Sequence, residues 1–348
     1  MLDTIPVRAD ERFSLDAVSS FLRATGLPWS DLEVQQFPAG HSNLTYLLRS
    51  GGWEAVLRRP PLGPVAPRAH DMAREYRILA RLNPVFPLAP KPYALCEDTS
   101  VIGAPFYVME RRHGLVLDAE LPAGFPRSAE LHGAIAETLV RGLVDLHAVD
   151  WVAAGLGEIG RPEGYMERQV KGWLERFSRV RTVELPELDR LAPWLVESLP
   201  ESPPARVIHN DYKLNNVLLD LDDPTHMTAV LDWEMATVGD PLSDVASLLV
   251  YWTEPGDEAL LGGLTSVTSE PTFPRRHEVL ELYGRLSGRD LSGLDWYLAF
   301  AYFKLAVICQ QIFYRWKVGQ TRDERFAGHE ATACALVRHA AALISQAI

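Results

Sequence analysis

The polar segment HNDYKLNN, residues 209–216, lies between two apolar runs and contains the residues best suited to chemistry. His209, Asp211 and Asn216 fit the spacing H-x-D-x-x-x-x-N, and Asp232 ends a later apolar run, AVLD. Taken alone, the triplet His-Asn-Asp is also compatible with a turn in which the aspartate caps a local N–H. A loop at the end of one strand and a carboxylate at the end of its neighbour can converge, and this favours a functional site.

These residue types match the requirements of phosphoryl transfer. Asparagine carbonyl and aspartate carboxylate oxygens are hard ligands suited to Mg²⁺, which makes Asn216 and Asp232 candidate metal ligands. Asp211 is then free to accept a hydrogen bond from a substrate hydroxyl. With a reference pKa of about 3.9 it is a weak base, so we expect it to position the hydroxyl and to take the proton late in the reaction.

The composition is that of a folded chain with an acidic surface. The 348 residues are 47% hydrophobic and 23% charged, enough for a sizeable core in two lobes. The formal net charge of −12 makes nucleic acid and anionic membranes unfavourable partners. The 3 cysteines lack metal-binding spacing, and the first residues lack the apolar segment of a signal peptide. We therefore expect a cytoplasmic protein.

The order of the predicted elements indicates an α+β, bilobal architecture. A hairpin over 44–58, a helix over 71–82 and a strand over 104–111 form the first part, and mostly helices follow. The apolar stretch 296–313 is interrupted by Lys304 and reads as a buried helix rather than a membrane span. The expected elements of the second part are a long helix around 131–146, helices at 163–179, 187–199, 241–253, 275–287, 294–317 and 328–346, and short strands near 206–208, 216–219 and 227–233.

Glu75 is a carboxylate in an unusual position. It lies on or beside the apolar stripe of the helix predicted over 71–82, between Met72 and Leu79. A carboxylate that faces the core is unfavourable unless a cation meets it. Taken alone, Glu75 also fits the exposed edge of the stripe.

Together these segments resemble the aminoglycoside phosphotransferase (kinase-like) family, in the branch that includes the kinase-like domain of acyl-CoA dehydrogenase family proteins. HNDYKLNNVLLD resembles the catalytic loop of that family, and VLDWEMATVGDPLSDVASLL resembles its metal-binding strand and the helix that follows. FPAGHSNLTYLL, AVLRRPP and REYRIL resemble motifs of its N-terminal lobe. The motifs occur in the right order over roughly 35–250, which makes the resemblance specific.

The resemblance implies a protein-kinase-like fold that uses ATP and Mg²⁺, with an N-terminal nucleotide-binding lobe over 1–112 and a catalytic lobe over 113–348. Asp211 is expected to be the catalytic base, with Asn216 and Asp232 as metal ligands and His209 bracing the loop. Glu75 would pair with a basic residue on the preceding strand, and Asp244 would tie its helix to the loop. The residues implied to contact the nucleotide are Gly40, His41, Ser42 and Asn43 over the phosphates, Arg58 and Glu75 in the pair, and Met109, Glu110 and Arg112 at the hinge.

Two features depart from the usual kinase pattern. The strand position that many kinases fill with lysine holds Arg58 or Arg59, and strand alternation lets only one of them face the cleft. Arg58 matches the family position best, and arginine can bind phosphate with two hydrogen bonds. There is no G-x-G-x-x-G segment, so residues 39–43 would cover the phosphates through backbone N–H groups and the Ser42 hydroxyl.

Several alternatives stay open. A pseudokinase-like binding module would keep the fold and lose transfer. A protein kinase would need a longer segment between LDWE and GDPLSD, for an activation segment and a peptide platform, than this sequence has. The acceptor implied by the resemblance is a hydroxyacyl-CoA or hydroxy acid, with an aminoglycoside or macrolide as the alternative. Asp240 before Pro241 reads as a helix N-cap, and Lys213 fits either an anion contact or a solvated lysine. The sequence decides neither the choice between ATP and GTP nor the oligomeric state.

Overall fold

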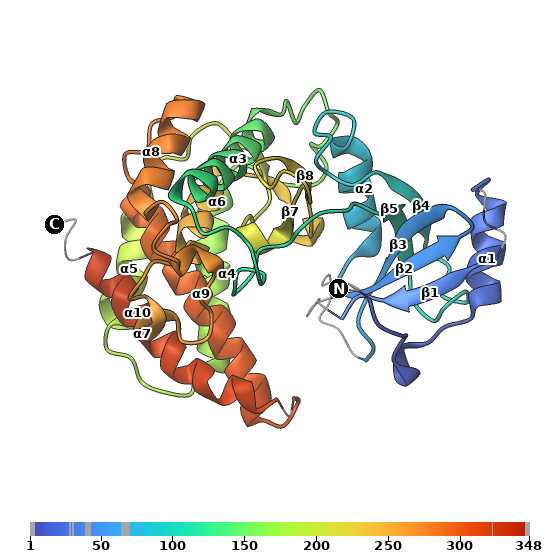
Figure 1. Ribbon diagram of the computed structural model, residues 1–348. Coiled ribbons are helices and arrows are strands. Elements are labelled where there is room, and N and C mark those ends of the chain that lie inside the picture. The colour runs from blue at the N-terminus through green and yellow to red at the C-terminus, as the bar shows by residue number, and fades with distance from the viewer. Residues whose placement is uncertain are drawn as a thin grey trace.

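The computed structural model describes residues 4–27, 29, 31–38, 43–63, 70–321 and 323–344. They form a small lobe that contains a five-stranded sheet and a larger lobe that is mostly helical (Figure 1). The predicted α+β, bilobal architecture is confirmed.

The small lobe is an antiparallel sheet with a helix on each face. The strand order is β1-β2-β3-β5-β4. Helices α1 (Leu15–Ala24) and α2 (Met72–Leu82) flank it, and each starts at a side-chain cap, Ser14 and Asp71 respectively. The strands are β1 (Glu33–Gln36), β2 (Leu44–Ser50), β3 (Trp53–Arg59), β4 (Pro92–Cys96) and β5 (Phe106–Glu110). The sequence did not predict α1, β1 or β4.

Alternation along β3 decides which side chains face the larger lobe. Ala55 and Leu57 pack in the cluster formed with α1, whereas Val56 packs in the cluster that includes α2 and the large lobe. Because Arg58 has the same parity as Val56, its side chain points to the α2 side. Arg59 is directed to the opposite face.

The large lobe is built around one long helix. Helix α9 (Leu294–Lys317) packs against α4, α6 and α10. Within the described chain it is the one helix long and apolar enough to cross a membrane, but 72% of its apolar window is buried, as expected of a core helix. The other helices are α3 (Ala129–Ala148), α4 (Tyr165–Val180), α5 (Leu188–Glu197), α6 (Pro241–Tyr251), α7 (Glu258–Leu261), α8 (Arg276–Ser287) and α10 (His329–Ile344).

Two small antiparallel sheets hold the polar segment. Strand β6 (Arg206–Ile208) pairs with β9 (Thr237–Gly239), and β7 (Val217–Leu219) pairs with β8 (Met227–Val230). The segment 209–216 therefore connects strands of different sheets. Figure 1 shows β7 and β8 at the side of the large lobe that faces α2 and the small lobe.

Candidate active site

The segment after β6 forms a turn that contains a residue in the left-handed backbone conformation, which few residue types adopt readily. Asn210 has φ 67°, in the left-handed region where asparagine is among the tolerated residues. Its side chain is fixed on both ends, because its Nδ2 donates to the carbonyl of Met235 at 3.0 Å and its Oδ1 accepts from the Tyr165 hydroxyl at 2.9 Å. The turn is thus held before it reaches Asp211.

His209 braces this turn from the buried side. The backbone N–H of Asp211 donates to His209 Nδ1 at 3.3 Å, so Nδ1 is an acceptor and the ring proton lies on Nε2. Nε2 then donates to the carbonyl of Leu231 at 2.9 Å. The imidazole therefore joins the loop that contains Asp211 to the strand end that precedes Asp232.

Asp244 on α6 holds the backbone of the same loop. Its carboxylate is fully buried and accepts the N–H groups of His209 and Asn210, each at 2.6 Å. His147 on α3 approaches it at 3.4 Å through Nε2, and burial lowers the pKa of this histidine, which favours its neutral form. The contact between Asp244 and the loop, which the resemblance of the sequence motifs implied, is present.

We expect Asp244→Ala to lower the free energy of unfolding by about 3 kcal/mol, because two buried N–H groups lose a charged acceptor. Urea unfolding monitored by circular dichroism measures this change. Asp145→Ala, at an exposed position of α3, is the matched control and is expected to change stability by less than about 0.5 kcal/mol. Equal effects in the two variants would contradict the anchoring role.

Asp211 faces two polar partners from its own loop. Its Oδ2 accepts from Asn216 Nδ2 at 2.8 Å, and its Oδ1 lies 2.9 Å from Lys213 Nζ. The Lys213 ammonium also lies 4.5 Å from the centre of the Tyr251 ring, so this lysine is directed inward rather than solvated. The loop therefore presents one carboxylate whose orientation is set by an amide and a cation.

Asp232 meets the loop at the common end of β7 and β8. The backbone N–H of Leu231 donates to the backbone carbonyl of Asn216 at 2.8 Å, so the chain just before β7 lies beside the chain just after β8. Asp232 itself adopts φ 65° and ψ 63°, a left-handed conformation typical of functional turns. Asn216 and Asp232 therefore follow each other across the two strand ends, and their joint binding of a metal stays a prediction.

Arg58 bridges the two lobes. Its Nη1 lies 2.6 Å from Glu75 Oε1 on α2, and its Nη2 lies 2.9 Å from Asp232 Oδ1. Glu75 is 1% exposed, and its carboxylate is paired with a cation on the preceding strand, as the resemblance implied. Burial raises the pKa of Glu75 to about 7, and the charge of Arg58 acts in the opposite direction.

The same guanidinium keeps Asp232 ionised. Burial acts to raise the pKa of Asp232, but the charge and hydrogen bond of Arg58 outweigh it and hold the pKa below its usual value. A charged Asp232 and the side-chain amide oxygen of Asn216 are hard donors, and Asn216 directs its amide nitrogen away to Asp211. This donor set fits Mg²⁺, with Asp232 and Asn216 as the residues that would hold it.

Further contacts join the lobes near Asp232. Asn43 Nδ2 donates to Glu234 Oε2 at 2.7 Å, and His70 Nδ1 lies 2.9 Å from Asn43 Oδ1. Arg74 on α2, which the sequence analysis did not single out, donates to the carbonyls of Glu234 and Ala236 at 3.0 and 2.6 Å. The other predicted phosphate-covering residues, Gly40, His41 and Ser42, lie outside the described residues.

The predicted hinge connects β5 to the large lobe. Met109 is nearly buried and belongs to the cluster on the α2 side of the sheet. The Glu110 carboxylate accepts from the backbone N–H of Lys91 at 3.1 Å and pairs with Arg112 at 2.9 Å, and Arg112 also donates to the carbonyl of Pro87. The hinge side chains are engaged with the chain before β4. Their predicted adenine contacts, through backbone groups, stay a prediction.

Asp240 has the structural role that the sequence indicated. It caps α6 by accepting the N–H of Leu242 at 2.9 Å, and it also accepts from the Tyr297 hydroxyl at 2.7 Å. The aromatic residues of α9 largely pack in the core, as predicted, although Tyr297 also borders a pocket described below.

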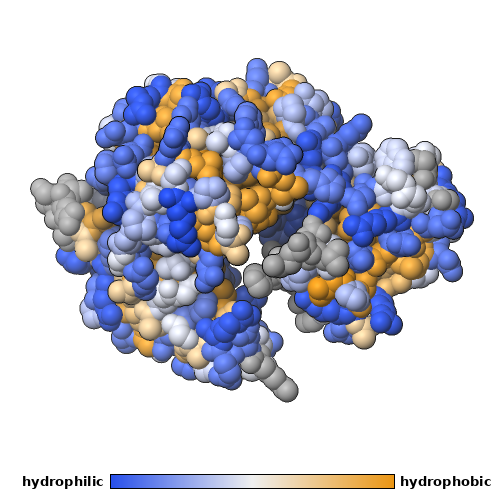
Figure 2. Space-filling view, in the orientation of Figure 1, coloured by the Kyte–Doolittle hydropathy of each residue, from blue (hydrophilic) through white to orange (hydrophobic). Residues whose placement is uncertain are grey.

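The space between the lobes is hollowed, and apolar side chains gather on its large-lobe side (Figure 2). Asp211, Asn216 and Asp232 sit on the large lobe, and Arg58, held by Glu75, reaches Asp232 from the small lobe. A two-lobed fold in which carboxylates of a helical lobe meet a cation from a small sheet lobe has the architecture of kinase-like phosphotransferases.

Comparison with known proteins gives the family. The model of the phosphotransferase enzyme family (APH) matches residues 33–279, and the chain belongs to this family. The resemblance inferred from the sequence motifs is confirmed. Curated relatives include acyl-CoA dehydrogenase family member 11 of Rattus norvegicus, 33% identical over 92% of this chain, and family member 10 of Mus musculus, 33% identical over 91%. The chain spans 42% and 30% of the length of these two relatives.

Solved structures share the fold. A protein of Ralstonia eutropha that is provisionally named an aminoglycoside phosphotransferase is 31% identical, with a TM-score of 0.81 over 96% of this chain and 99% of that one. Choline kinase of Cryptosporidium parvum has a TM-score of 0.64 at 13% identity, over 96% of each chain. At that identity the likeness shows the fold alone.

Proposed function

We propose that this protein is an ATP- and Mg²⁺-dependent kinase that transfers the γ-phosphate to a hydroxyl group of a small molecule. The observation that supports this most is the guanidinium of Arg58, which reaches across from the small lobe, where Glu75 holds it, to Asp232 on the large lobe, on the same side as the loop of Asp211 and Asn216. When bound, Mg²⁺ would neutralise charge on the phosphates. Solved ternary complexes of APH(4)-Ia variants with AMP-PNP or ADP and hygromycin B support the choice of an adenine nucleotide.

In this mechanism the residues act mainly by position. Asp211 would accept the hydrogen bond of the acceptor hydroxyl and receive its proton late. Lys213, paired with Asp211 in the structure, would stay near the transferred phosphoryl group and offset its charge. Asp244 and His209 would keep the loop rigid, so that Asp211 holds the acceptor hydroxyl at a fixed position relative to the γ-phosphate.

The acceptor we propose is a hydroxy acid or a hydroxyacyl-CoA. The curated relatives named acyl-CoA dehydrogenase family members favour an acyl substrate, and the provisional name of the Ralstonia eutropha protein keeps an aminoglycoside as the alternative. Helix α6 begins at Pro241, shortly after Asp232, which leaves little chain for the peptide platform of a protein kinase. We place the protein in the cytoplasm, without nucleic acid or membrane as partners.

The test is a coupled assay of ADP release with Mg²⁺, in which pools of 3- and 4-hydroxyacyl-CoAs, free hydroxy acids and aminoglycosides are compared. We expect one pool to stimulate turnover, EDTA to abolish it and excess Mg²⁺ to restore it. A melting temperature that rises with ATP, together with no stimulation by any pool, would instead support a nucleotide-binding module that has lost transfer. No response to ATP in either measurement would exclude both.

A further inference from the structure

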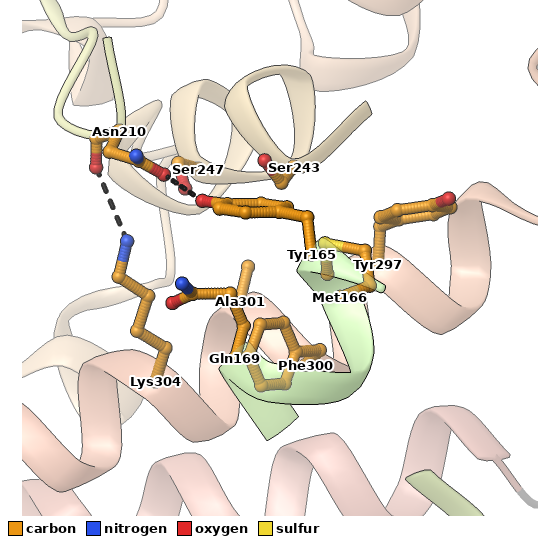
Figure 3. A pocket seen from close by; sticks show the side chains of 10 residues that line it. All are labelled: Tyr165, Met166, Gln169, Asn210, Ser243, Ser247, Tyr297, Phe300, Ala301 and Lys304. Atoms are coloured by element: carbon orange, nitrogen blue, oxygen red, sulfur yellow. Dashed lines mark hydrogen bonds between the residues drawn. The ribbon is translucent and has the colours of Figure 1, made fainter. Parts of the chain in front are cut away.

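Lys304 is a half-buried cation in the middle of an apolar helix. It lies on the face of α9 that meets α4 and the loop of Asn210, and its Nζ donates to the Asn210 carbonyl at 3.2 Å (Figure 3). The Lys304 ammonium also faces the Trp173 ring, whose centre lies 5.7 Å from Nζ. Among the described residues no Asp or Glu forms an ion pair with Lys304.

Two neighbouring carboxylates do not serve as its partners. Asp211 and Asp244 are near enough to favour the charged form of Lys304, but Asp211 Oδ1 is paired with Lys213. The oxygens of Asp244 accept backbone N–H groups of the catalytic loop. Burial lowers the pKa of Lys304 and outweighs this attraction. One carbonyl and a distant aromatic face compensate only part of the cost of removing an ammonium from water. An isolated lysine kept at such a place therefore calls for an anion that the protein chain itself does not supply.

A small pocket opens beside the Lys304 ammonium. It is lined by residues of α4, α6 and α9 together with the catalytic loop. The lining side chains include Tyr165, Gln169, Ser247, Phe300, Lys304 and Asn210. Figure 3 shows Tyr165 and Lys304 both reaching Asn210, the residue directly before Asp211. None of the 10 lining residues is acidic. The pocket has hydroxyl and amide groups and one positive charge.

We propose that this pocket binds an anionic group of the acceptor, with Lys304 as the residue that selects for it. The inference rests on the proposed kinase function, because Asn210 places the pocket next to the carboxylate that would receive the hydroxyl. A cationic acceptor such as an aminoglycoside would bring like charge to the half-buried Lys304 ammonium, which is unfavourable. The acidic charge of the whole chain, −12, is therefore reversed locally at the acceptor. Two sources of the anion share this chemistry, a free carboxylate and the phosphates of a CoA thioester.

The test compares Lys304→Met with Lys317→Met, which removes the same charge from the exposed end of the same helix. The probes are 3- and 4-hydroxy fatty acids, their neutral amides and their CoA thioesters. For each, KM and kcat are measured with ATP and Mg²⁺, and binding is measured by calorimetry. Methionine fits an apolar helix, and loss of a buried charge is often tolerated, so the variant is expected to fold.

We expect the wild type to prefer an anionic probe to its amide. Lys304→Met should raise KM for that probe about 10- to 100-fold and leave KM and kcat for the amide within about twofold, and Lys317→Met should match the wild type. A preference for free acids identifies a carboxylate, and a preference for thioesters alone identifies the CoA phosphates. Either result supports the inference.

Other outcomes separate the two proposals. If Lys304→Met lowers kcat equally for acid and amide, Lys304 only supports the Asn210 carbonyl and the inference is overturned. It is also overturned if the wild type shows no preference for the anion, or if no anionic probe binds. If an acid binds and Lys304→Met abolishes binding, yet no phosphate is transferred, the anion site stands and the kinase function fails.

Discussion

Asp211→Asn is expected to lower kcat by about 10²–10⁴-fold while the affinity for ATP changes little. The asparagine keeps the size of the side chain but cannot take a proton from the acceptor hydroxyl, and it loses the ion pair that joins Asp211 Oδ1 to Lys213. Asn216 would still find an oxygen for its amide nitrogen, so the loop should retain its shape. Single-turnover transfer to the best acceptor, with ATP binding measured in parallel, separates chemistry from binding.

Asp222→Asn is the matched control, because this exposed aspartate lies in the turn after β7 and the substitution removes the same charge from the same region. Its kcat should equal that of the wild type. If Asp211→Asn retains full kcat, Asp211 is not the group that positions the hydroxyl. If both kcat and ATP binding are lost, the substitution has disrupted the loop, and the melting temperature would show this.

Arg58→Met is expected to affect both stability and nucleotide binding. It removes the only cation that the described structure pairs with Glu75, and breaking one side of a buried ion pair costs about 3–5 kcal/mol. It also removes the guanidinium proposed to face the phosphates, so KM for ATP should rise at least about tenfold. Chemical unfolding and steady-state kinetics measure the two effects.

The stability loss should depend on pH with a defined sign. The folded-state pKa of Glu75, raised to about 7, lies above its value of 4.5 in an unfolded chain. The stability linked to this group is therefore fully present below 4.5 and is lost as pH rises through about 7. Without Arg58 the attraction that opposes the raised pKa disappears. The variant should thus lose more stability between about pH 5 and pH 8 than the wild type does.

Arg59→Met provides the control for the neighbouring position. Arg59 points to the other face of β3, away from Glu75 and Asp232, so its loss should leave the ATP KM unchanged and should not steepen the pH dependence. The reverse result, with Arg59→Met weakening ATP binding and Arg58→Met neutral, would move the phosphate contact to Arg59. Equal pH profiles for Arg58→Met and the wild type would contradict the pairing of Arg58 with Glu75.

Local patterns were sufficient for most of the large lobe. Apolar stripes of helical period predict the helices α3, α4, α6, α8 and α9. Asp240 before Pro241 predicts the start of α6. The spacing of His209, Asp211 and Asn216, with Asp232 at a strand end, was enough to place a candidate site. These features depend on neighbours in the sequence, which is why they could be read from it. Strands β1 and β4 were missed because short strands at the sheet edges have weak periodicity and owe their structure to packing. Helix α1 was missed although the sequence contains its signals, the Ser14 cap and the apolar residues Val18 and Leu22 at helical spacing.

The sequence by itself determined the kind of chemistry, through one loop whose residue types and order suit phosphoryl transfer. The tertiary structure decided which groups meet. The alternation of side chains along β3 directs Arg58, and not Arg59, toward the cleft. There Arg58 pairs with the buried Glu75 of another element. It also brought Lys304 from α9 to Asn210, a contact between positions distant in the chain. In the sequence, Lys304 stood out as the one charged residue in the apolar run 296–313. Charge pairing and pocket lining depend on distances set by long-range packing, and local sequence patterns do not contain those distances.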